Sequence, residues 1–162
     1  MTPSRFLSAS VAAAIAGLIG ITVYLAVERC LVEHVRLVLS FLQLLQWDAS
    51  NFYGAAAFRG GWDMALRGLG ADFVVSLIWA FLFTTLYVTL PIVRRYPALS
   101  GLCYGVVVMI VMIFGVVPLG HAVPVEMSTP HLINILVAHT LFFGVPVGMM
   151  VDNSLSGLHF GR

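Results

Sequence analysis

Residues 96–120 read YPALSGLCYGVVVMIVMIFGVVPLG and contain no charged side chain. A helix rises about 1.5 Å per residue, so roughly 20 apolar residues cross a hydrocarbon core about 30 Å thick. Three other stretches are long and apolar enough to do the same: residues 6–27, 73–93 and 132–151. Within lipid, a helix satisfies its own backbone hydrogen bonds. We therefore predict an all-α polytopic protein with four transmembrane helices in a single membrane domain, residues 1–162.

The composition indicates that lipid is the solvent for much of the surface. Of the 162 residues, 60% are hydrophobic and 9% are charged, whereas a soluble domain has roughly 25% charged residues. The net charge of +1 argues against a nucleic-acid partner, which would require a basic face. The lipid bilayer is therefore the first predicted partner.

The N-terminal run and the arginines predict the orientation. The run 6–27 exceeds the apolar core of a secretory signal, which has about 7–15 residues, so we interpret it as a retained helix. Arg94 and Arg95 lie in the short connection after the second span, while the connection 121–131 has no arginine. Short loops rich in arginine face the cytoplasm. We predict that both termini are cytoplasmic.

A shorter apolar stretch, residues 37–47, lies between the first two spans. Its polar residues recur at helical spacing and form one stripe: Arg36, Ser40, Gln43 and Gln46. We predict an amphipathic helix at approximately 33–47, either lying in the membrane interface or folded against the bundle. Residues 48–70 are rich in Gly and Ala, and we expect short helices and turns there.

Small residues at four-residue spacing allow helix backbones to approach one another in lipid. The glycines in such positions predict helix-packing contacts: Gly17, Gly20, Gly101, Gly105, Gly144 and Gly148. These contacts serve either packing within one bundle or association between copies of the chain.

His139 and Asp72 form the candidate polar intramembrane site. An ionisable side chain inside a membrane helix is costly and is a functional candidate by default. His139 is either a neutral imidazole bonded to a neighbouring helix or a proton relay. Asp72 opens the second predicted span, where a carboxylate caps a helix N-terminus. The two side chains should differ in depth by about 10 Å, so we expect no direct contact.

Metal and haem sites have weaker sequence support. Four residues of the outer segments could offer metal ligands: His34, His121, Glu126 and His131. They lack tight ligand spacing such as HExxH, and an ordinary loop is the other interpretation. Haem would need a second deep histidine besides His139, so we predict no cofactor.

Chemistry based on thiols or on other nucleophiles has no sequence support. Cys30 and Cys103 form no CxxC motif and belong to opposite ends of their spans, so we expect no disulfide. Signatures such as GxSxG and phosphate loops are absent. We predict that the chain is not an enzyme.

Several motifs resemble one family of small bacterial inner-membrane proteins. They are LQWDAS (45–50), GAAAFRGG (54–61), ALRGLGADF (65–73), LCYGV (102–106), VVPL (116–119), and Ala138-His139 followed by GVP (144–146). The chain is distantly similar to the YagU-type proteins. The resemblance implies a four-helix protein of the bacterial inner membrane but no established activity. The family pattern has histidine at Asp72 and asparagine at Ile113, so no functional residue is transferred.

Three functional hypotheses follow. The first is a non-catalytic helical bundle that acts as a homo-oligomer or as an accessory subunit of a membrane complex. The alternative is a proton- or solute-conducting channel or transporter component that uses His139. The third is a metal- or haem-binding redox subunit.

Overall fold

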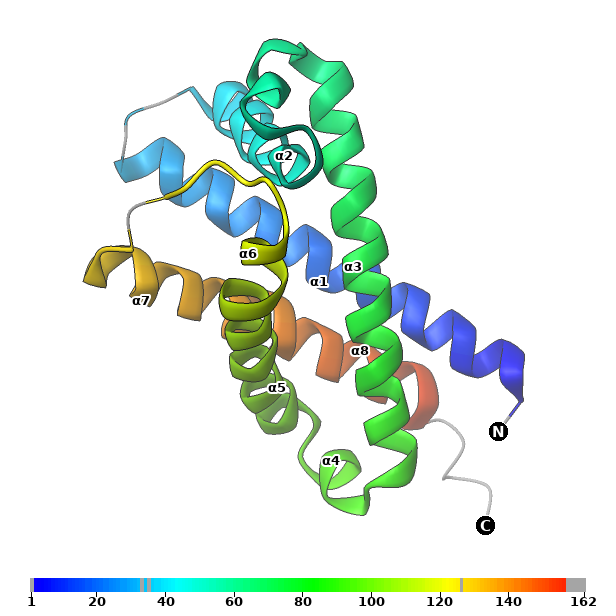
Figure 1. Ribbon diagram of the computed structural model, residues 1–162. Coiled ribbons are helices and arrows are strands. Elements are labelled where there is room, and N and C mark those ends of the chain that lie inside the picture. Colours follow the sequence, from blue (N-terminus) through cyan, green and yellow to red (C-terminus); the bar gives the residue numbers. More distant parts are fainter. Residues whose placement is uncertain (1, 33, 35, 126, 157–162) are drawn as a thin grey trace.

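Four long apolar helices make up most of the chain (Figure 1). The computed structural model describes residues 2–32, 34, 36–125 and 127–156. The helices long and apolar enough to cross a membrane are Pro3–Val32, Gly61–Thr89, Pro97–Leu119 and Thr129–Leu155. The first is α1 and the second is α3. This confirms the predicted all-α membrane fold.

The third and fourth long helices each contain a π-helical turn. The third consists of α5 (Pro97–Val111), η2 (Met112–Val116) and α6 (Val117–Leu119), and the fourth of α7 (Thr129–Val137), η3 (Ala138–Gly144) and α8 (Val145–Leu155). Pro118 and Pro146 lie just beyond these turns. Because proline has no backbone N–H, it removes one i→i−4 hydrogen bond, and a π-turn is one way in which a helix adjusts.

The second long helix begins earlier than expected, at Gly61 rather than at residue 73. Gly61 has φ +54°, a left-handed conformation that glycine adopts without strain. From Gly61 to Thr89 the helix has 29 residues and is about 43 Å long. It is therefore longer than a hydrocarbon core of about 30 Å. It ends before Pro91, which starts the short helix α4 (Pro91–Arg95).

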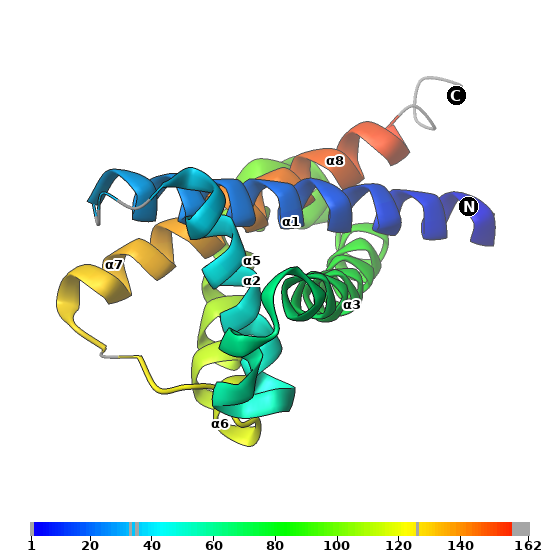
Figure 2. The same cartoon turned by 90° about the horizontal axis from the view of Figure 1, so that it is seen from above.

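The shorter helix α2 (Leu37–Tyr53) is folded against the bundle. It extends past the expected end at residue 47 and stops at Gly54, whose φ of +55° ends the helix before the 3₁₀ helix η1 (Gly54–Arg59). Ser40 and Gln46 on its polar stripe are buried. The stripe therefore faces protein, and α2 packs on α3 and α1 (Figures 1 and 2).

The last long helix lies between α1 and α5. It packs against α1 along one side and against α5 along another. Helix α3 also packs against α1 (Figure 2). Phe83, Val147 and Val151 are the largest fully buried apolar side chains. The Ser10 hydroxyl donates to Thr84 Oγ1 at 3.0 Å and joins α1 to α3. Such interhelical bonds contribute about 0.6 kcal/mol each in membranes.

The six glycines singled out in the sequence all lie at contacts within this chain. A methyl group on Gly101 would collide with the carbonyl oxygen of Gly144, and one on Gly105 with that of His139. Gly17 faces Phe143 and Val147; Gly148 faces the backbone of Pro97 and Gly101. Gly20 lies against the carbonyl oxygen of Phe142. In a regular α-helix the N–H of residue 146 would donate to this oxygen, but Pro146 has no N–H.

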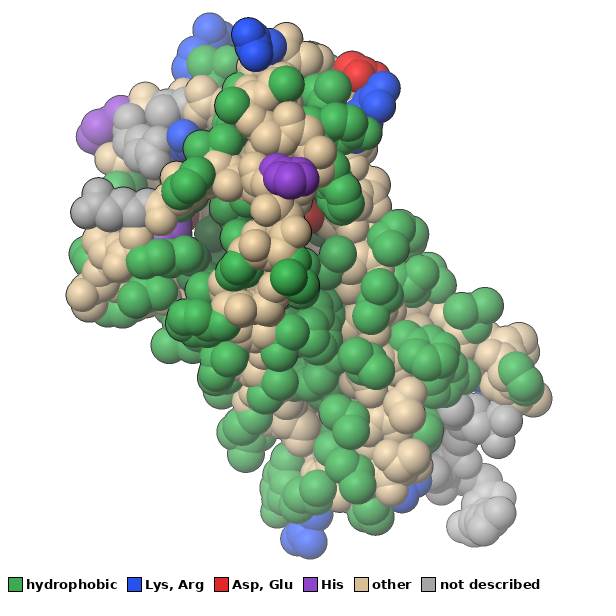
Figure 3. All heavy atoms as spheres, in the orientation of Figure 1, with side chains coloured by type: hydrophobic (Ala, Val, Ile, Leu, Met, Phe, Trp, Pro, Cys, Tyr) green, Lys and Arg blue, Asp and Glu red, His purple; other side chains and the backbone are tan. Residues whose placement is uncertain are grey.

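Polarity divides the molecule along its length. On the face shown in Figure 3, arginine side chains gather at the two ends and hydrophobic side chains fill the surface between them. The start of α1, the end of α8 and the short helix α4 lie at the same end (Figure 1), as four crossings require. The opposite end carries α2, η1 and the 120–125 segment. It is called the outer end below, a name that follows the orientation predicted from the sequence.

Candidate functional site

The outer part of the fold depends on a backbone contact between α2 and α3. At Gly68 of α3, a methyl group would collide with the carbonyl oxygen of Leu45 and would lie 3.0 Å from the backbone nitrogen of Ala49. Ala49 and Ala65, which are close along the chain to this contact, are fully buried. Only glycine at position 68 allows α2 and α3 to lie this close together.

Asp48 and Asp72 lie next to this contact, one on each helix. Asp72 follows Gly68 by four residues, and Asp48 immediately precedes Ala49, so each is close to the point where the backbones meet. The two carboxyl groups are within hydrogen-bonding distance of each other. Both side chains are partly buried.

The pair is built to hold a proton. Burial and the neighbouring Asp72 carboxyl raise the pKa of Asp48 well above its usual range. Two carboxyl groups in hydrogen-bonding contact cannot both ionise without strong repulsion, so one proton is retained between them. The pair therefore keeps a proton at pH values where an ordinary aspartate has lost it.

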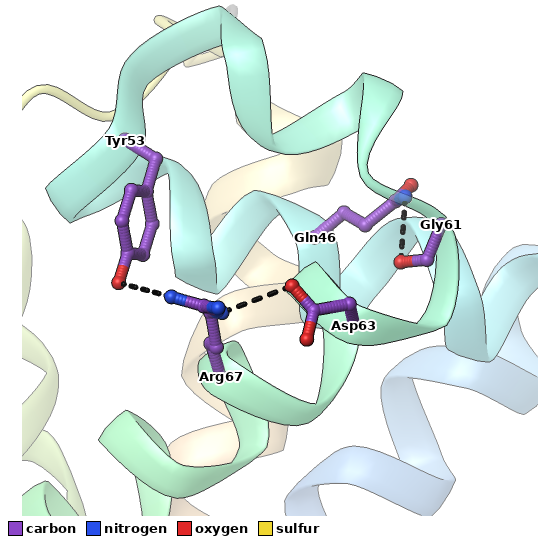
Figure 4. Close-up of polar contacts among 5 residues, drawn as sticks. All are labelled: Gln46, Tyr53, Gly61, Asp63 and Arg67. Atoms are coloured by element: carbon purple, nitrogen blue, oxygen red, sulfur yellow. Dashed lines mark hydrogen bonds and ion pairs between the residues drawn. The ribbon is translucent and has the colours of Figure 1, made fainter.

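Within the described residues, no salt bridge neutralises the pair. The nearest arginine on α3 is Arg67, which is directed elsewhere (Figure 4). Its Nε donates to Asp63 Oδ2 at 3.1 Å, and another guanidinium nitrogen donates to the Tyr53 hydroxyl at 3.3 Å. Arg67 and Asp63 are exposed, so solvent screens their ion pair and it adds little to stability.

The outer segment after α6 is attached to α2 by three hydrogen bonds. Trp47 Nε1 donates to the carbonyl oxygen of Val123 at 3.0 Å, and the backbone N–H of Val123 donates to Ser50 Oγ at 3.2 Å. The backbone N–H of His121 donates to the carbonyl oxygen of Asn51 at 2.8 Å. The turn of α2 that carries Asp48 therefore also holds the 121–123 segment.

The predicted cap role of Asp72 is wrong. Because α3 begins at Gly61, Asp72 lies about three turns inside the helix. The predicted boundary placed a helix start where the structure has a helix interior. Asp72 instead faces α2.

His139 lies in η3 and is partly buried. Its Nδ1 lies 2.9 Å from the carbonyl oxygen of Ile135, one turn earlier in the same long helix. Among the described residues, no hydrogen bond joins His139 to Asp48 or Asp72. The structure therefore does not combine the two predicted polar residues into one site.

The candidate metal ligands are scattered over the outer end. His34 and His121 are exposed, and His131 lies in the first turn of α7. Glu126 lies outside the described residues. Within the described part of the chain, no three His, Cys, Asp or Glu side chains are placed to hold a metal ion. Cys30 and Cys103 are free thiols.

Sequence reasoning missed Asp48. The expected helix ended at residue 47, so Asp48 was placed in a flanking turn. The informative signal was the spacing of Gly68 and Asp72, which share one face if the second helix starts early. Asp48 is then the acidic side chain of α2 that can meet Asp72.

Comparisons of the chain with protein-family models, with curated proteins and with solved structures found no match. Function is therefore inferred from the geometry of the site.

Proposed function

We propose that this integral membrane protein is proton-coupled, with Asp48 and Asp72 as the groups that bind the proton. The observation that carries the proposal is the hydrogen-bonded carboxyl pair without a salt-bridge partner among the described residues. A buried acid pair is a common way to give carboxyl groups a proton affinity suited to proton transfer.

The position of the pair gives it access to the outer solution. Asp72 lies five residues beyond the exposed Arg67 on α3, which corresponds to about 7.5 Å along the helix. Both carboxyl-bearing residues keep some exposed surface. Protons can therefore reach the pair from the outer end without crossing the hydrocarbon core.

Polar side chains continue from the pair toward the inner end of α3. Ser76 and Thr84 are buried at multiples of four residues from Asp72, and the Tyr87 hydroxyl donates to Asp152 at 2.6 Å. Ala80 separates Ser76 from Thr84, so transfer across the whole membrane would require water between them. This line supports a channel or transporter component as the specific form of the proposal.

His139 is a second proton-binding candidate. Its Nδ1 contacts the carbonyl oxygen of Ile135, which fixes Nδ1 as the protonated nitrogen of a neutral ring and leaves Nε2 to accept a further proton. We place the aspartate pair first because it combines two acids from different helices.

Proton flux into liposomes tests the proposal. The protein is reconstituted around a trapped pH-sensitive dye, and a potassium diffusion potential drives proton entry. Asp48→Asn and Asp72→Asn should each reduce flux by at least about tenfold, because the neutral amide cannot exchange the proton. Asp63→Asn, which changes an exposed aspartate on the same helix, should leave the flux unchanged. Wild-type flux equal to that of empty liposomes would refute the proposal.

The orientation belongs to the same proposal. We place the chain in a bacterial inner membrane with α4, the start of α1 and the end of α8 in the cytoplasm, because Arg94 and Arg95 gather there. The carboxyl pair then lies near the opposite, external surface. Modification of single cysteines by a membrane-impermeant reagent tests this: a cysteine in η1 should react in intact cells, and one in α4 should not.

A second candidate function is that of an accessory subunit or homo-oligomer. The observation that favours it is a group of exposed aromatic side chains around η1: Phe52, Tyr53, Phe58 and Trp62. The glycine contacts do not add support, because all six are used within the chain. Native mass spectrometry after gentle extraction should show a defined oligomer or partner; a monomer alone would exclude this candidate.

A further inference from the structure

Helix α2 connects two parts of the outer end. Through Gly68 it touches α3, and through three hydrogen bonds it holds the 121–123 segment. No other helix is joined to this segment by a hydrogen bond among the described residues. Any movement of α2 away from α3 would therefore move the 121–123 segment with it or break these bonds.

We propose that α2 is a pH-controlled latch, which docks on α3 while Asp48 and Asp72 share a proton and undocks when both carboxyl groups ionise. This inference rests on the proton-binding role proposed above and adds what proton release does to the fold. The proton leaves to the outer aqueous phase, and the two carboxylates then repel each other across the helix contact.

The contact between α2 and α3 is suited to this control. Besides the acid pair, polar attachment comes from Gln46 Nε2, which donates to the carbonyl oxygen of Gly61 at 3.1 Å, and from the exposed bond between Arg67 and Tyr53 (Figure 4). Leu45 and Ala49 of α2 and Ala65 of α3 are buried beside the backbone contact at Gly68. Because few hydrogen bonds join α2 to α3, repulsion between the carboxylates of Asp48 and Asp72 has few bonds to break.

The backbone allows α2 to move as a unit. Arg36 before the helix is extended, with ψ 133°, and Gly54 after it has φ +55°. The residues at the two ends of α2, Arg36 and Gly54, thus have backbone conformations that are not α-helical. Changes of backbone dihedral angles at such positions are the usual basis of hinge motion.

Among the described residues, the other charged groups on the surrounding elements form no salt bridge with the carboxyl pair. Arg59 on η1 and His121 in the outer segment are exposed; Arg67 binds Asp63 and Tyr53. At the end of α1, Glu28 interacts electrostatically with Tyr24, and Arg29 interacts with another group. Besides burial, the group that raises the pKa of Asp48 is the Asp72 carboxyl, and among the described residues no salt bridge compensates ionisation of the pair.

Distances between spin labels test the latch on the full chain in lipid. Cys30 and Cys103 are replaced by serine, and labels are placed on Leu39 of α2 and Val74 of α3, both of which are exposed. Between about pH 5 and about pH 9 the ratio of docked to undocked molecules should fall by at least about tenfold, the effect of one pKa unit of differential proton binding. Asp48→Asn and Asp72→Asn should remain docked throughout, and Asp63→Asn should behave like the wild type.

A single distance that does not change with pH would overturn the latch, as would an unchanged transition in Asp48→Asn. Infrared spectra of the same samples separate this failure from failure of the proposed function. A carboxylic-acid band that disappears in both Asn variants, together with a fixed distance, means that the pair binds a proton but α2 does not move. Absence of that band in the wild type refutes the proton-binding role itself.

Discussion

Gly68→Ala tests the helix contact on which the carboxyl pair depends. The added methyl group would collide with the carbonyl oxygen of Leu45, and it would lie 2.9 Å from the Leu45 carbonyl carbon and 3.0 Å from the Ala49 nitrogen. These are backbone atoms in the middle of α2, so no side chain can rotate away. The two helices must separate, and the carboxyl groups of Asp48 and Asp72 must separate with them.

The size of the effect follows from two opposing contributions. Overpacking at a tight contact costs about 1–3 kcal/mol, whereas alanine in place of a mid-helix glycine stabilises a helix by about 0.5–1 kcal/mol. Gly70→Ala is the matched control, because no atom outside its own helix lies within 4 Å of a methyl group at Gly70. The difference between the variants, about 1–3 kcal/mol, is then the cost of the clash.

The free energy of unfolding in mixed detergent micelles measures this difference. Gly70→Ala should be as stable as the wild type or more stable, and Gly68→Ala should be less stable than Gly70→Ala by the stated amount. The infrared carboxylic-acid band should also change in Gly68→Ala alone. Equal stability of the two variants would show that α2 and α3 do not meet at Gly68.

Three further predictions concern single contacts. Because the pKa of Asp48 is raised, the folded state is favoured at pH values below the ordinary aspartate pKa of about 3.9 and loses this advantage as pH rises through the raised value. Asp48→Asn should therefore be more stable than the wild type near pH 8 and similar to it near pH 4, in unfolding measurements at both pH values. A double-mutant cycle of Ser10→Ala and Thr84→Val should give a coupling free energy of about 0.6 kcal/mol. A coupling of zero would contradict the buried hydrogen bond between α1 and α3. Trp47→Phe should speed hydrogen exchange at the backbone N–H of Val123, because the indole no longer holds this segment; unchanged exchange would contradict that attachment.

The four long helices could be predicted because length and apolar composition suffice for crossing a membrane. The start of α3 could not, since Gly60, Gly61 and Gly68 together resemble turn residues. In the structure, Gly61 does begin the helix, but Gly68 is a contact residue inside it. A glycine in this region can therefore mark either the start of a helix or a close contact between helices, and only the tertiary packing distinguishes the two roles.

The candidate site was predictable only in part. Asp72 stood out as an acid next to an apolar run, but its partner depends on how far α2 extends and on which of its faces meets α3. Asp48 lies beyond residue 47, where the apolar stretch ends, and packing continues the helix to Tyr53. The spacing of Gly68 and Asp72 marks one face of α3, but no local feature of the sequence shows that this face meets Asp48 of α2.

Stability alone does not account for two acids at this position. An aspartate facing an asparagine could form a hydrogen bond of similar strength, about 0.5–1.5 kcal/mol, without two groups competing for one proton. The pair lies where Gly68 brings α2 and α3 together, and it has no salt-bridge partner among the described residues. Local features that cost stability occur preferentially at functional sites. Because the same turn of α2 also holds the 121–123 segment, the protonation state of the pair is positioned to control the outer end of the protein.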